Sequence, residues 1–161
     1  MSATTTHEAE TVSNELYTGI SPEVRLELEK RERTRKTRPG ETLLQYGVMP
    51  EQLVLLKSGK VEISVNSSAH DVVLGTIGPG KAFGMRAAMT GEPAEITVTC
   101  IGECEIDEIP IAEFQAVLQS NPQLYFVVAK VLSADLKIVD ELLRSCSRRV
   151  VSAARKNLRE V

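Results

Sequence analysis

Residues Gly80–Thr99, GKAFGMRAAMTGEPAEITVT, have the composition of a loop that wraps a phosphate group. Two glycines precede a short Ala-rich helical turn, and a strand follows the turn at Pro93. Phosphate is bound by backbone N–H groups at a helix start together with a cation, preferably the planar fork of arginine. The arginine in this stretch is Arg86, and the next one along the chain is Arg144. Arg86 either faces the loop or, as exposed arginines usually do, the solvent.

Other reactive side chains are few. The two histidines, His7 and His70, lie in polar segments and suggest neither a metal site nor a nucleophile–base pair. The carboxylates of residues 103–108 have strand spacing, which places them on a solvated face rather than in an acid–base pair. We therefore expect no enzymatic activity and no metal cofactor.

Charge and cysteine usage restrict the class of protein further. The net charge of -3 excludes a uniformly basic nucleic-acid binder, although cations gather in residues 30–38 and 144–159. Three cysteines without a C-x-x-C pair fit a reducing compartment. No apolar run has signal-peptide or membrane-spanning length. We expect a cytoplasmic protein with no membrane span.

The elements that must position the loop follow from the periodicity of the chain. Residues 1–14 are polar and lack periodicity, which predicts a disordered leader. Helix-like segments follow, with Ser21 as an N-cap, until Arg38-Pro39-Gly40 stops any helix. Residues 41–109 contain short Val-, Ile-, Leu- and Thr-rich runs between turn signals, which predict an antiparallel sandwich or barrel. Residues 111–120 form a short helix and residues 121–151 a long one, with Asn121 as its N-cap.

The long helix carries a heptad seam, in which apolar residues alternate at spacings of four and three. A second apolar set, on an adjacent face, suits packing against the sheet. Two apolar faces favour a parallel helix pair in a homodimer, whereas the alternative buries both faces in one subunit. The seam consists of Tyr125, Ala129, Leu132, Leu136, Val139, Leu143, Cys146 and Val150, and the second set of Val128, Val131, Ile138 and Leu142.

The end of this helix leaves two questions open. Cys146 lies in the seam and is either a small buried apolar residue or the site of a redox-sensitive crosslink between two copies. The basic residues that follow either are solvated at the helix C-terminus or contact an acidic partner, a nucleic-acid backbone or a membrane surface. The residues after Cys146 form one basic helix and no helix-turn-helix, so we expect no specific DNA binding.

The order of elements and glycines resembles the cyclic nucleotide-binding domain of the catabolite activator protein and its relatives. The resemblance covers about residues 16–145. It is carried by the turn glycines Gly40, Gly47, Gly59, Gly78 and Gly80, by the Phe83-Gly84 step and by Thr97-Val98. It implies a fold that is mostly β with flanking helices: a jelly-roll β-barrel (double-stranded β-helix) with a long C-terminal helix that serves as hinge and dimer contact.

The resemblance also implies that Gly80–Thr99 is the phosphate-binding cassette of the family. The family usually has Glu after Phe-Gly, for the ribose hydroxyl, and Arg after the cassette proline, for the phosphate. This chain has Met85 and Ala94 there, followed by Glu95. Binding of cAMP or cGMP is therefore not expected if the geometry is kept. The candidate pocket consists of Phe83, Gly84, Met85, Arg86, Ala87, Ala88, Ala94, Glu95, Ile96 and Thr97.

The sequence thus predicts a leader (1–14), a cyclic nucleotide-binding-like barrel (15–120) and a dimerisation helix with a basic tail (121–161). The predicted function is that of a non-catalytic regulatory or sensor domain in signal transduction, homodimeric and with a degenerate cassette. No cofactor is expected, apart from a cyclic nucleotide if the cassette still binds one. The alternative is a purely structural dimerisation or protein-interaction module that binds no small molecule.

Overall fold

The strands that follow residue 41 form one antiparallel sheet, as their alternation predicts. The computed structural model describes residues 13–67 and 70–159, so residues 1–12 of the expected leader lie outside the described part. The pairing path is β1–β6–β3–β4, with β2 also on β6 and β5 on β3, and the sheet is not closed into a complete barrel. The strands are β1 (Arg33–Lys36), β2 (Thr42–Leu44), β3 (Gln52–Ser67), β4 (His70–Ile77), β5 (Ala82–Phe83) and β6 (Thr97–Pro110).

Strand β1 differs from the sequence prediction, which expected helix-like structure up to residue 38. Its sequence, RTRK, has no apolar residue to mark one face of a strand. It pairs instead with the acidic half of β6, where Arg33 stands opposite Glu108 and Lys36 opposite Glu105. Arg35 Nε also lies 2.9 Å from Glu108 Oε1. Opposite charges on neighbouring strands therefore stabilise this edge of the sheet. Such pairs leave no alternation of apolar and polar residues in the sequence from which a strand could be predicted.

The helical elements begin and end largely where capping residues place them. Ser21 Oγ accepts a hydrogen bond from the Val24 N–H, which confirms the predicted N-cap. The expected N-cap at Asn121 is wrong, because its side-chain amide donates to the Val117 carbonyl at 2.8 Å and ends the preceding helix instead. The elements are η1 (Glu15–Tyr17), α1 (Pro22–Glu29), α2 (Met85–Thr90), α3 (Ile111–Ser120) and α4 (Leu124–Arg159).

Two apolar cores hold these elements together. The helical core joins η1, α1, α3 and the start of α4 to one side of the sheet, with Leu16, Phe114 and Leu124 fully buried. The sheet core lies among the strands and includes Val61, Val98 and Ile106. The cassette segment lies between the two cores and contributes side chains to both of them.

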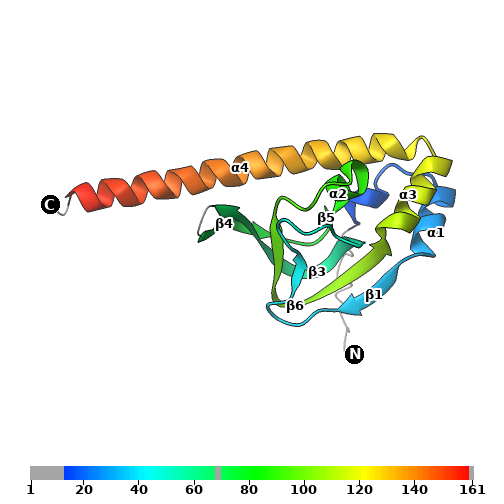
Figure 1. The fold of residues 1–161 in the computed structure, drawn as a ribbon, viewed down its shortest axis with the longest axis horizontal. Helices are drawn as coiled ribbons and strands as arrows, with labels where there is room; N and C mark the ends of the chain where they lie inside the picture. The colour runs from blue at the N-terminus through cyan, green and yellow to red at the C-terminus, as the bar shows by residue number, and fades with distance from the viewer. Residues whose placement is uncertain (1–12, 68–69, 160–161) are drawn as a thin grey trace, which may run out of the picture.

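Helix α4 is continuous over 36 residues, so the basic tail prolongs it rather than forming a separate helix. It runs along the molecule, and its C-terminal part, red in Figure 1, projects beyond the sheet. Its inner face packs on both cores as the second apolar set predicts, since Val128 and Val131 are buried and Leu142 contacts the sheet core. A Cβ at Gly75 of β4 would come within 2.6 Å of Leu142 Cδ2, so α4 packs closely on β4 at this glycine.

Candidate functional site

The cassette segment has the backbone that its glycines predict. Gly84 precedes α2 with φ +93°, and a Cβ there would lie 3.3 Å from the Gln52 carbonyl oxygen. Both the left-handed conformation and the close approach to β3 require glycine. Helix α2 ends at Gly91, which is also left-handed with φ +70°. These glycines are needed for the fold whether or not a ligand binds.

The structure divides the predicted pocket residues between the two cores. Met85 and Ala88 belong to the helical core, and the Met85 side chain is buried with 1% exposure. Phe83 and Ala94 belong to the sheet core, with Ile96 packed against it. The two positions at which the family carries its recognition groups, Met85 and Ala94, are thus filled by apolar side chains in different cores. Of the other predicted pocket residues, Ala87 is also buried.

Arg86 lies on the outer side of the cassette. Its guanidinium is 2.8 Å from Glu92 Oε2 and 2.6 Å from Glu95 Oε1, and its side chain is 44% exposed. The single arginine of the cassette is therefore paired with two carboxylates of the same segment. A phosphate would have to compete with both of them for this cation.

The end of the cassette is held by its backbone. The Ala94 N–H donates to the Val48 carbonyl at 3.1 Å, and the Gly47 N–H donates to the Ala94 carbonyl at 2.8 Å. The half-buried Thr97 hydroxyl accepts from the Tyr46 N–H at 3.0 Å. Gly47 and Val48 thus occupy both backbone groups of Ala94, the position at which the resemblance places the phosphate-binding arginine.

A second charged cluster lies at the start of the cassette, and it was not predicted from the sequence. The Lys81 ammonium contacts Asp135 Oδ1 of α4 and lies 2.8 Å from Glu15 Oε1 of η1, although its side chain is only 9% exposed. Glu15 Oε1 also accepts from the Ala82 N–H at 2.9 Å. Three elements distant in the sequence meet at this cation. The available signal was weak: Lys81 stands between Gly80 and the apolar residues of β5, and a lysine that is buried there needs carboxylate partners.

A third charged site lies at the edge of the sheet. Burial of Glu32 raises the pKa of its carboxyl to about 7, with a further increase from Asp107 and an opposing effect of Lys57. Within the described residues, Glu32 Oε1 has no hydrogen-bond partner. A polar hollow of about 390 Å³ lies beside it, lined by Lys30, Arg31, Glu32, Arg33, Gln52, Glu108, Pro110 and Glu113.

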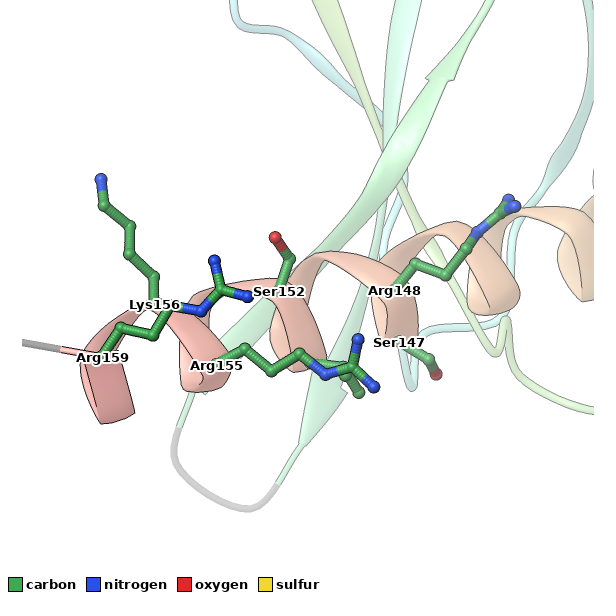
Figure 2. A pocket seen from close by; sticks show the side chains of 7 residues that line it. Ser147, Arg148, Ser152, Arg155, Lys156 and Arg159 are labelled. Atoms are coloured by element: carbon green, nitrogen blue, oxygen red, sulfur yellow. The ribbon is translucent and has the colours of Figure 1, made fainter.

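Most residues of the predicted seam are exposed to solvent on the outer face of α4. Leu136 is 74% and Val150 63% exposed, and Tyr125 and Leu143 are about half exposed. Leu132 packs against the helical core instead. Beyond the sheet, Arg148, Arg155, Lys156 and Arg159 line a hollow of about 620 Å³ along α4 (Figure 2). Because α4 alone supplies its lining, this hollow is an open basic surface rather than an enclosed site.

The described residues contain no cluster of three metal-ligating side chains. Within the same part of the chain, no helix is both long enough and apolar enough to cross a bilayer. These observations leave the cassette and the outer face of α4 as the candidate functional regions.

Comparison with known proteins identifies the family. Residues 34–121, more than half of the chain, match the model of the cyclic nucleotide-binding domain. The chain therefore belongs to this family, and the resemblance read from its glycines is confirmed. The cyclic nucleotide-gated potassium channel mll3241 of Mesorhizobium japonicum is 24% identical over 115 residues, which are 71% of this chain and 31% of the channel. The chain thus spans about a third of this relative.

Solved structures agree in fold. The catabolite activator protein of Thermus thermophilus matches with a TM-score of 0.68 and 22% identity over 83% of this chain and 63% of that one. The regulatory subunit of a cAMP-independent protein kinase A from Trypanosoma brucei matches with a TM-score of 0.64 and 16% identity. This match covers 76% of this chain and 43% of that subunit. A triple variant of that subunit, bound to cAMP in its A site, matches with a TM-score of 0.63 and 16% identity. This match covers 74% of this chain and 42% of the variant.

Proposed function

We propose that this chain is a regulatory domain that does not take cAMP or cGMP in the usual manner and that acts through pairing of α4 with a second copy. The observation that carries the proposal is the state of the only cassette arginine, Arg86, whose guanidinium is paired with Glu92 and Glu95. The cyclic-nucleotide fold is retained, while the charge that would hold a phosphate is neutralised within the cassette itself.

The apolar residues at the two recognition positions support the same conclusion. Met85 is packed in the helical core, so a ribose hydroxyl would meet no carboxylate there. Ala94 is packed in the sheet core and offers no cation to a phosphate. Loss of one member of a buried charge pair weakens binding by roughly 2–5 kcal/mol, or about 30-fold to several thousand-fold. The regulatory subunit of the cAMP-independent protein kinase A from Trypanosoma brucei is a precedent among proteins of similar fold.

Isothermal titration calorimetry with cAMP and cGMP tests the ligand part of the proposal. We expect the unmodified chain to bind neither with a Kd below about 10 μM. The variant Met85→Glu/Ala94→Arg/Glu95→Ala restores both recognition groups and removes the competing carboxylate, so it should bind cAMP at least about 30-fold more tightly. Met85→Glu/Glu95→Ala is the matched control, because it lacks the new arginine and should remain weak. A Kd below 10 μM for the unmodified chain would contradict the proposal.

The exposed outer face of α4 supports the pairing of two copies. Leu136, Leu143 and Val150 repeat every seven residues and are about half exposed or more. Burying a leucine or valine side chain stabilises an interface by about 1.5–3 kcal/mol, so several such residues can hold a helix pair. The inner face is already committed to the two cores, which leaves the outer face for a partner.

Analytical ultracentrifugation tests this pairing. We expect a species of twice 17.6 kDa at micromolar concentration, and Leu143→Asp/Val150→Asp should weaken it by about 100-fold or more. Leu158→Asp is the control, because Leu158 is 77% exposed on the same helix but lies outside the seam. Only monomer for the unmodified chain, or equal weakening by Leu158→Asp, would contradict pairing through the seam.

The second candidate is a purely structural dimerisation module, and the tight packing of Met85 favours it. The two candidates differ in their response to small molecules. A thermal-shift screen of nucleotides and small anions separates them, because a regulatory ligand stabilises the folded state in proportion to its occupancy. A structural module gives no shift with any compound.

A further inference from the structure

Lys81 is held between the sheet and α4 in a defined position. Its carbonyl accepts from the Leu56 N–H of β3 at 2.9 Å and from the Asn14 side-chain amide at 3.1 Å. The backbone of Lys81 is therefore fixed to the sheet, and its ammonium reaches across to Asp135 of α4 and Glu15 of η1. We call Lys81, Glu15 and Asp135 the Lys81 latch.

The Lys81 latch joins the regions on which the proposed function depends. Lys81 lies at the start of the cassette, three residues before Gly84, which precedes α2, and strand β5 is all that separates them. Asp135 directly precedes Leu136, an exposed residue of the seam. Glu15 closes the arrangement by accepting the Ala82 N–H of β5 as well as the Lys81 ammonium.

Burial makes this contact decisive for the position of α4. A buried cation cannot exchange its carboxylates for water without cost, whereas an exposed one can. If α4 moves away from the sheet, Lys81 loses Asp135 and keeps a single carboxylate. The position of β5 and the position of α4 are consequently linked through one side chain.

We propose that the Lys81 latch is the conformational device that holds the first half of α4 and the η1 segment on the sheet and transmits the position of the cassette to the outer face of α4. The transmission of this change to a partner copy rests on the proposed pairing of α4. The contact that holds α4 on the sheet lies within one chain and does not depend on that pairing.

Hydrogen exchange measured by mass spectrometry tests the latch in the full chain carrying Leu143→Asp/Val150→Asp, so that pairing cannot affect the result. In this background, Lys81→Met keeps the length of the side chain and removes its charge. We expect exchange of the amides of residues 124–145 to be accelerated about 10- to 100-fold more than exchange of the amides of β3 and β6, because the charge-assisted contact is lost at α4. Unchanged exchange in residues 124–145 would overturn the proposal, as would equal acceleration throughout β3 and β6.

Single replacements of the two acids provide a second test that tolerates poor folding of Lys81→Met. Asp135→Asn should accelerate exchange in α4 and leave residues 14–17 protected by Glu15. Glu15→Gln should do the reverse, since it releases η1 while Asp135 still holds α4. Identical exchange patterns in the two variants would refute a latch with two separate arms.

Lys57 offers a matched control. Its ammonium also lies near two carboxylates, 3.4 Å from Glu105 Oε1 and 3.9 Å from Asp107 Oδ1, but its side chain is 38% exposed and all three residues belong to the sheet. Lys57→Met should leave exchange in α4 unchanged. Acceleration there equal to that caused by Lys81→Met would show a general charge effect and overturn the proposal.

Discussion

Two clusters with the same composition, one cation and two carboxylates, lie on either side of strand β5. In one, Lys81 is 9% exposed and joins η1 to α4. In the other, Arg86 is 44% exposed and pairs with Glu92 and Glu95 of its own segment. Removing one partner of a buried cluster leaves charges without water, whereas removing one from an exposed cluster does not. The two clusters contain the same number of charged groups. They differ in the burial of the cation and in the distance along the sequence between the residues that they join.

The largest expected effect comes from the buried cluster. Lys81→Met should lower the free energy of unfolding by about 1–3 kcal/mol, because it leaves two partly buried carboxylates together without their cation. Adding Glu15→Gln and Asp135→Asn should recover most of this loss, since no unpaired charge then remains. Urea denaturation of the three proteins at one pH measures both effects. A loss below about 1 kcal/mol for Lys81→Met would show that the buried cluster contributes no more to stability than an exposed ion pair does.

A smaller effect is expected at Glu32, which is partly buried and has a carboxylate oxygen without a partner in the described part of the chain. Its pKa is raised to about 7 from 4.5, first by burial and then by Asp107. The folded state thus prefers the protonated acid, which stabilises the fold at low pH. This contribution is lost as the pH rises from 4.5 through 7.

Glu32→Gln cannot ionise, so its stability relative to the unmodified chain should rise between pH 5 and pH 8. Urea midpoints at these two pH values provide the measurement. A pH-independent difference for Glu32→Gln would show that burial does not control the ionisation of this carboxyl.

The smallest effect is expected at the exposed cluster. Arg86→Gln should change the free energy of unfolding by at most about 1 kcal/mol, because solvent screens its pairs with Glu92 and Glu95. High salt should reduce the difference further. Urea denaturation at low and high ionic strength measures both. A loss comparable with that of Lys81→Met would remove the distinction between the two clusters.

Much of the fold could be predicted because local patterns determine it. Alternating strands and turn glycines act over a few residues, and the strands form one antiparallel sheet as expected. The heptad seam is mostly exposed on α4, and its role in pairing stays a prediction. Strand β1 could not be predicted, since Arg33–Lys36 has no apolar face and pairs through charges with β6. Asn121 was ambiguous because its side chain can cap either of two adjoining helices, and it ends α3.

The candidate site could be predicted only in part, for a similar reason. The absence of a second cassette arginine is a property of the sequence and needs no structure. The pairing of Arg86 with Glu95, and the packing of Met85 and Ala94 in different cores, depend on how the loop folds back. The Lys81 latch joins residues 66 and 54 positions apart, which no local period connects.

The length of α4 gives the Lys81 latch a long reach. With a rise of about 1.5 Å per residue, the 24 residues from Asp135 to Arg159 span about 36 Å. A rigid rod of this length that pivots by about 5° at Asp135 moves its far end by about 3 Å, roughly the length of a hydrogen bond. A pivot at Asp135 would therefore also move Leu142 off the sheet core and Arg149 off the Leu74 carbonyl, and the largest displacement would fall at the basic end of the helix.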